Sequence, residues 1–205
     1  MHKMQHVTEQ ELDILHYFYE HRRGHVRQVK KAVKLSEHTL LKYLDSLEKR
    51  KMVTFKREGN LKIYEVNLEK AFVKVFFSYF DLERLEILEY RRAKAVKMFA
   101  EEVKKIKLPY FILLFGSTAK GNYNAKSDID IIVIFDVLEK NLNLKIDRIK
   151  KNILAETAIT VNPIVMRLDE FLKEIKNKQN YALLDAITFG YPVFGNLLYY
   201  EVVFQ

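Results

Sequence analysis

Two short stretches near the middle of the chain contain residues that could bind phosphate and a metal ion. Gly116 and Ser117 follow directly after an apolar run over residues 110–115. A glycine that leaves a buried strand lets the backbone come close to a ligand, and the start of a helix after it favours phosphate. Asp128 and Asp130 stand at the start of the next apolar run. Because they are two residues apart in a strand, both carboxylates project from the same face.

The paired carboxylates indicate a cation site. Neighbouring carboxylates repel each other unless a cation lies between them, and Mg²⁺ with nucleotide phosphates is the usual solution. A phosphate-binding turn beside such a pair predicts metal-dependent phosphoryl or nucleotidyl transfer. Other phosphate loops match less well: Gly116 and Gly121 have the P-loop spacing, but Asn122 stands in place of its lysine, and G-x-G-x-x-G is absent.

These motifs lie in a segment whose pattern alternates between strands and helices. We expect strands over 110–115, 127–135 and 158–167, a short polar helix after Gly116, a helix over 141–155 and further helical turns over 169–189. This pattern predicts the α/β class, with a short mixed sheet flanked by helices.

The stretch from Gly116 to Asp130 resembles the signature of the DNA polymerase β-like nucleotidyltransferases, especially the minimal prokaryotic and archaeal ones. That signature reads G-S-x-A-[RK]-G, five variable residues, then S-D-x-D on the next strand, and the chain matches each element. The resemblance implies that Gly116, Ser117 and Lys120 bind the triphosphate of an NTP, with ATP as the expected substrate. It also implies that Asp128 and Asp130 are catalytic and bind Mg²⁺ or Mn²⁺.

The implied activity moves a nucleoside monophosphate from the NTP to a protein, an RNA end or a small molecule. Some relatives of this kind are antitoxins that modify a partner toxin, which makes such a protein one expected acceptor. The chain departs from the family at the third carboxylate of the next strand, where its counterpart is Asn162. An amide can coordinate a metal but carries no negative charge. Glu156 is near in sequence but lies at the end of the preceding helix. A regulator whose transferase domain only senses nucleotide therefore stays open as an alternative.

The first third of the chain predicts three helices and a hairpin. We expect helices over 8–21, with Thr8 as N-cap and Glu11 three residues later, over 26–33 and over 36–51, then strands over 53–57 and 61–66. Residues 8–66 resemble the winged helix-turn-helix domains of prokaryotic transcription regulators. In those domains the third helix enters the major groove and the hairpin touches the phosphate backbone.

The resemblance implies DNA contacts from the third helix and from the wing. The residues concerned are His38, Thr39, Lys42, Tyr43, Lys56, Arg57 and Lys62. The charge distribution agrees, because residues 1–66 contain 14 Lys and Arg against 9 Asp and Glu, a net charge of +5 out of +8 for the chain. The alternative is a winged helix that docks another protein.

The segment between these two parts is helical and apolar. Aromatic residues crowd positions 71–80, and Asp81 is expected to cap a second helix that ends near Lys107. Such a helix packs the two domains together or dimerises two chains. We therefore predict a winged helix over 1–68, a helical connector with a possible homodimer contact over 69–108, and a nucleotidyltransferase domain over 109–205.

Composition limits the class of protein and its expected cellular location. The chain of 205 residues is 49% hydrophobic and 30% charged, which is typical of a globular protein. It contains no cysteine, so disulfides and thiolate chemistry are excluded. The apolar runs are too short to span a membrane and no signal peptide is visible, so we expect a cytoplasmic protein without a membrane partner.

Overall fold

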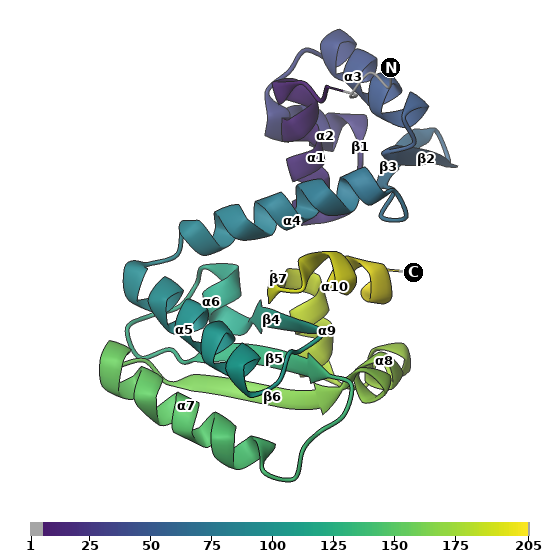
Figure 1. Cartoon of the computed structure of the whole chain (residues 1–205). Helices are drawn as coiled ribbons and strands as arrows, with labels where there is room; N and C mark the ends of the chain where they lie inside the picture. The colour runs from purple at the N-terminus through teal and green to yellow at the C-terminus, as the bar shows by residue number, and fades with distance from the viewer. Residues whose placement is uncertain (1–5, 205) are drawn as a thin grey trace. The chain divides into compact units, whose positions relative to one another are not determined.

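Figure 1 shows the computed structural model of the chain, which describes residues 6–204 as two compact units. Of the described residues, the first unit comprises those up to Phe80 together with Phe204, and the second comprises Asp81–Val203. This division differs from the expected one, in which 69–108 is a separate connector. The later part of that segment belongs to the second unit, because side chains such as Phe99 are fully buried in that unit's core. No helix within the described residues is long and apolar enough to cross a membrane.

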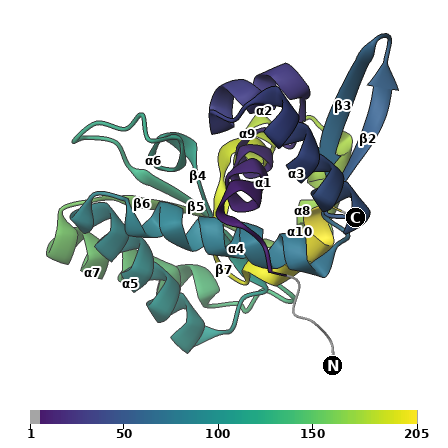
Figure 2. The same cartoon turned by 90° about the horizontal axis from the view of Figure 1, so that it is seen from above.

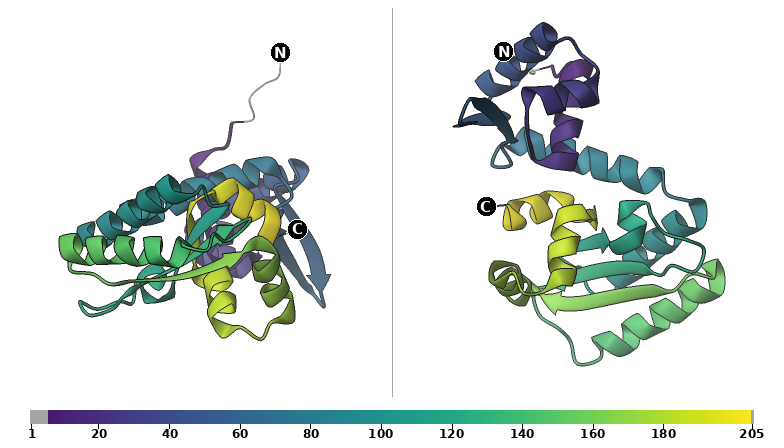
Figure 3. Two further views of the ribbon diagram at one scale, coloured as in Figure 1. Left: turned by 60° about the horizontal axis from the view of Figure 1, so that its bottom comes forward. Right: turned by 180° about the vertical axis from the view of Figure 1, so that it is seen from behind.

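Within the described residues, the first unit contains three short helices, a three-stranded antiparallel sheet of order β1-β3-β2, and the first part of a longer helix, α4. Its elements are α1 (Glu9–His21), β1 (Arg23–His25), α2 (Val26–Val33), α3 (Glu37–Lys49), β2 (Val53–Glu58) and β3 (Leu61–Val66). The helices and the hairpin lie where the sequence predicts them, whereas the pattern does not predict the short strand β1. Figures 2 and 3 show the β2–β3 hairpin reaching out beyond the helices of this unit.

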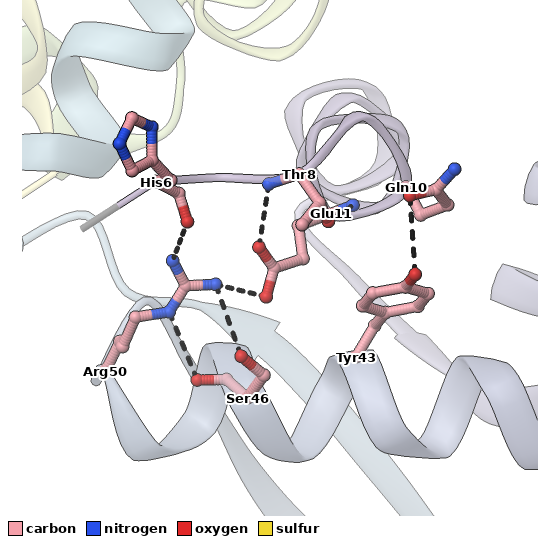
Figure 4. Close-up of polar contacts among 7 residues, drawn as sticks. All are labelled: His6, Thr8, Gln10, Glu11, Tyr43, Ser46 and Arg50. Atoms are coloured by element: carbon pink, nitrogen blue, oxygen red, sulfur yellow. Dashed lines mark hydrogen bonds and ion pairs between the residues drawn. The ribbon is translucent and has the colours of Figure 1, made fainter.

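A buried ion pair joins α1 to α3 (Figure 4). Glu11 is 3% exposed, and its carboxylate binds the guanidinium of Arg50, which also donates to the backbone oxygens of Ser46 at 3.3 Å and His6 at 3.4 Å. Burial by itself would raise the pKa of Glu11, but hydrogen bonds from Thr8, Ser46 and Arg50 bring that pKa below its ordinary value. Glu11 and Thr8 also form the predicted capping box. This carboxylate therefore fixes both the start of α1 and its place on α3.

The second unit is built on a mixed sheet of four strands with the order β6-β5-β4-β7. In the part of the chain that the structure describes, its elements are the end of α4 (Ala71–Glu86), α5 (Tyr90–Ile106), β4 (Phe111–Phe115), α6 (Gly116–Lys120), β5 (Ile129–Phe135), α7 (Leu142–Thr157), β6 (Val161–Arg167), α8 (Leu168–Asn177), α9 (Tyr181–Phe189), β7 (Tyr191–Phe194) and α10 (Asn196–Val203). β5 runs antiparallel to β4 and parallel to β6. β6 lies at the edge of the sheet, a position that tolerates Pro163, which cannot donate a ladder hydrogen bond.

Helices cover both faces of this sheet (Figures 1 and 3). On one face, α5 and α7 pack over a core that includes Ile112 and Ile131. On the other, Phe111 meets Phe171 of α8, with ring centroids 5.5 Å apart. Because side chains alternate along a strand, Asp130 lies on the face opposite to Ile131. That face is the one covered by α8 and α9.

The sequence-based prediction that Asp81 caps a helix is wrong. α4 continues through Asp81, and α5 begins at Tyr90 with Glu89 as its N-cap. Asp81 is 1% exposed, and its carboxylate accepts hydrogen bonds from Asn196 Nδ2 at 3.0 Å and from the hydroxyl of Tyr200 at 2.9 Å. Both of these partners come from α10, near the C-terminal end of the unit, and Asp81 lies inside α4 instead of at the start of a helix.

Candidate active site

The ends of three strands bring the predicted site residues together. Phe115, the last residue of β4, pairs with Asp130 near the start of the antiparallel strand β5. Asp130 also pairs with Asn162 near the start of the parallel strand β6. The Gly116–Ser117 turn follows β4 directly, and Asp128 directly precedes β5. The two motifs that the sequence indicates therefore meet at one end of the sheet.

Gly116 occupies a position where any side chain would overlap the carboxylate of Asp130 unless that carboxylate moved. Its φ is +69°, in the left-handed region, and a Cβ built there would lie 2.2 Å from Oδ2 of Asp130. Gly121 also has a left-handed backbone, with φ of +74°, but no atom lies within 4 Å of a Cβ built on it. Gly121 therefore ends α6, whereas Gly116 lets the backbone pass directly beside the carboxylate of Asp130.

The two aspartates have different surroundings. Asp128 is exposed, and Asn162 Nδ2 donates a hydrogen bond to its Oδ2 at 3.0 Å. Asp130 is half-buried, and burial raises the pKa of its carboxyl group. A hydrogen bond from Asn162 lowers that pKa, whereas the negative charges of Asp128 and Asp185 raise it further. The net effect is a raised pKa, because the charged form is poorly compensated where it stands.

Asp185 is a residue of this site that the sequence analysis missed. It lies on α9, and its Oδ1 forms an ion pair with Lys120 Nζ at 2.5 Å. The Lys120 ammonium also lies 4.9 Å from the ring centroid of Phe189. Lys120, predicted to bind phosphate, is thus held at the site by a carboxylate. The available signal was that Asp185 is the one charged residue of α9, which is otherwise apolar and neutral.

Glu156 does not supply the missing third carboxylate. It lies on α7, on the face of the sheet opposite to Asp130, and pairs with Lys94 of α5 with 3.1 Å between Nζ and Oε2. Asn162 therefore remains the residue beside the two aspartates on β6.

The predicted DNA-binding residues of the first unit differ in how free their side chains are. Lys56 pairs with Glu65, Lys62 pairs with Glu48 and lies over the ring of Phe55, Thr39 bonds to Ser36, and Tyr43 donates to Gln10. His38 and Lys42 on α3 are exposed, as is Arg57 on β2, and the described residues provide no hydrogen-bond or ion-pair partner for these three side chains. These three are the available candidates for contacts with an external partner.

Comparison with known proteins bears on the second unit. The profile of the nucleotidyltransferase domain family matches residues 96–188. A curated protein of Methanocaldococcus jannaschii, "Putative protein adenylyltransferase MJ0604", is 37% identical over 87 residues, which cover 40% of this chain and 80% of that protein. The chain belongs to the nucleotidyltransferase family. The matched part of this nucleotidyltransferase holds Gly116, Ser117 and both aspartates, and also Asn162 and Asp185.

The donor set of the nucleotidyltransferase site fits a divalent cation of the kind that the family generally uses with its NTP. Asp128 and Asp130 provide carboxylate oxygens, and Asn162 can add an amide oxygen if its side chain turns. Among the described residues no group of three or more His, Cys, Asp or Glu side chains is arranged to hold a metal ion. Mg²⁺ usually keeps several waters and binds through one or two carboxylates together with substrate phosphates.

Asp130→Asn should stabilise the metal-free protein at neutral pH. The pKa of Asp130 is raised in the folded state, so the folded protein holds this proton more tightly than the unfolded chain does. Its unfolding free energy therefore falls as the pH rises from the ordinary aspartate pKa to the folded-state pKa, and the neutral amide avoids that loss. Thermal unfolding in a chelator should give a higher Tm for the variant at neutral pH, and the difference should vanish as the pH falls below about 4. A lower Tm for the variant at neutral pH would contradict this.

Proposed function

We propose that this chain transfers a nucleoside monophosphate, AMP first of all, from an NTP to a protein acceptor such as a partner toxin. The meeting of the Gly116–Ser117 turn with Asp128 and Asp130 at one end of the sheet carries the proposal. The printed name of the M. jannaschii relative, a protein adenylyltransferase, supports the choice of AMP and of a protein. In this reaction the oxygen of an acceptor hydroxyl bonds to the α-phosphorus and its proton passes to water. The bond from that phosphorus to the bridging oxygen breaks, and pyrophosphate leaves with the electron pair.

Each side chain has a part in this proposal. The absence of a Cβ at Gly116 leaves room for the triphosphate beside Asp130, and the Ser117 hydroxyl orients the phosphates. Lys120 exchanges its partner Asp185 for a phosphate oxygen. Asp128 and Asp130 would hold Mg²⁺ or Mn²⁺, which would neutralise phosphate charge and polarise the α-phosphate when bound.

Nucleotide and metal together should stabilise the protein against heat. A ligand present at a hundred times its dissociation constant adds about 2.7 kcal/mol to the unfolding free energy. Thermal unfolding with each NTP, with and without Mg²⁺ or Mn²⁺, should show a shift that needs both components. Double replacement Asp128→Asn/Asp130→Asn should remove the shift. No shift with any nucleotide would leave the second unit as a scaffold.

A second candidate function is regulation without catalysis. Asn162 favours it, because its amide occupies the position of the third carboxylate and donates to Asp128 instead of adding charge. In this alternative the second unit binds nucleotide and the first unit reads DNA. Transfer of an α-phosphate label to any acceptor separates the two, since a sensor would bind nucleotide but transfer nothing.

For the first unit we propose a winged helix that binds duplex DNA through α3 and the β2–β3 hairpin. His38, Lys42 and Arg57, whose side chains have no hydrogen-bond or ion-pair partner in the described part of the chain, carry the main contacts. Arg57 on the wing is the cation best placed to meet phosphate. Replacing Lys42 and Arg57 with alanine should weaken binding of mixed-sequence duplex and reduce the slope of log affinity against log salt by about 1 for each lost phosphate contact. Fluorescence anisotropy from low to moderate salt measures this.

Lys49→Ala provides the matched control for the DNA experiment. Lys49 lies at the end of the same helix α3 and is already paired with Asp45 at 2.7 Å. This change should leave affinity and salt slope close to those of the unmodified protein. If Lys42→Ala and Arg57→Ala bind DNA as tightly as Lys49→Ala, or if the unmodified protein binds no duplex at low salt, the first unit has another role, with protein docking the first to test.

A further inference from the structure

Arg92 is a buried cation that the sequence analysis did not connect with the site. It lies in the first turn of α5 and is 3% exposed. Its guanidinium donates to Thr118 Oγ1 at 2.9 Å and to the backbone oxygens of Asn124 at 2.8 Å and Ser127 at 2.7 Å. One side chain therefore joins α6 of the first motif to the loop that carries the second motif.

The loop before Asp128 is arranged around this guanidinium. Ser127 N donates to Asn124 O at 3.1 Å, and Asn124 N donates to Ser127 Oγ at 3.0 Å, so these two residues close a turn. The carbonyl oxygens of the same two residues both accept from Arg92. The ring of Tyr123 lies 4.2 Å from the guanidinium carbon and covers it. The planar, five-donor guanidinium matches this set of acceptors in a way that an ammonium group cannot.

The acceptors of the Arg92 guanidinium are all neutral, whereas the backbone N–H of Arg92 donates to Oε2 of the N-cap Glu89 at 3.1 Å. No carboxylate among the described residues pairs with the guanidinium, although buried arginines are rarely found without an anionic partner. The nearest link to the catalytic carboxylates runs through Thr118, whose hydroxyl also lies 3.4 Å from the backbone oxygen of Asp128. Arg92 therefore adds a fixed positive charge behind a site that must hold an anionic nucleotide.

We propose that Arg92 is a positioning residue for nucleotidyl transfer: it clamps the loop over residues 121–128 to α6, and so sets the place of Asp128 relative to the Gly116–Ser117 turn. This inference rests on the proposed function of the same site. Arg92 does not touch the reacting atoms. It acts through the backbone of the loop that ends at Asp128 and through Thr118.

Arg92→Lys tests the clamp because it keeps the charge and loses the planar set of donors. In the intact 205-residue chain, hydrogen exchange measured by mass spectrometry should become faster by about tenfold or more in the peptide that contains Ser127, as expected for lost hydrogen bonds to a charged group. With NTP and Mg²⁺, kcat should fall by about 100-fold, the loss that a misplacement of about 1 Å can cause. The Mg²⁺ concentration for half-maximal rate should rise, while KM for the NTP changes little.

Two further variants make the outcomes distinct. Arg91→Lys changes the preceding, exposed arginine and should behave as the unmodified protein. Thr118→Val removes one acceptor of Arg92 at similar volume, and it replaces Arg92→Lys as the test if that variant does not fold. It should change loop exchange, kcat and the Mg²⁺ requirement in the same directions, but by less. Normal loop exchange in a folded Arg92→Lys protein overturns the proposal, and so does faster exchange with unchanged kcat and Mg²⁺ requirement. Failure of the proposed function looks different: the unmodified protein would then show neither transfer nor a nucleotide-dependent thermal shift, while faster loop exchange in Arg92→Lys would still support the clamp.

Discussion

Asp128→Asn should lower the rate of transfer of an α-phosphate label by about 10³-fold, because a bound metal ion contributes several kcal/mol of transition-state stabilisation. The loss should be severe in this chain, since the neighbouring β6 residue is Asn162 and only Asp130 would keep a negative charge on these strands. Asp128 is exposed, so the variant should fold. The measurement is label transfer at saturating NTP and Mg²⁺, with circular dichroism to verify the fold.

Two further variants are needed to interpret the result for Asp128→Asn. Asp147→Asn makes the same chemical change on α7, at a carboxylate 3.7 Å from Lys150, and should leave transfer unchanged. Asn162→Asp returns a carboxylate to β6 and should raise a weak activity if the site has partly lost its function. Label transfer by Asp128→Asn at the rate of the unmodified protein would show that the activity does not use this site.

The elements of this chain could be predicted because local residues mark their ends. Thr8 and Glu11 predict the start of α1, and the capping box is present. Pro163 predicts that its strand either is an edge strand or begins there, and β6 is at the edge of its sheet. The strand β1 could not be predicted, because three residues around Gly24 carry no periodic pattern and pair only through contacts with β3, which is distant in sequence.

The part of the candidate site that lies in one continuous stretch of sequence could be predicted. The distances along the sequence between the motif residues from Gly116 to Asp130 are visible in the sequence itself, and strand pairing brings the two ends of this stretch together. Asp185 and Arg92 reach the same site from helices on either side of that stretch, so their roles depend on packing between distant segments. Asp81 shows the same limit: its type suggests a helix cap, but partners from α10 decide its use.

Gly116→Ala and Gly121→Ala should separate backbone strain from damage to the site. Both glycines have a left-handed backbone, so each alanine should cost roughly 1–3 kcal/mol in unfolding free energy. Only the Cβ at position 116 would meet the carboxylate of Asp130, at 2.2 Å. We therefore expect similar losses of Tm in the two variants, but a loss of label transfer of about 100-fold or more in Gly116→Ala alone.

The reason lies in what can move to relieve the overlap. The atom in the way is the end of a side chain, so Asp130 can turn aside and the fold can survive. The turned carboxylate would no longer stand beside Asp128, and the thermal shift given by NTP with Mg²⁺ should disappear together with transfer. Gly121→Ala has open space at its Cβ and should keep both. Equal loss of transfer in the two variants would mean that loop strain, and not the close approach of Gly116 to Asp130, limits the site.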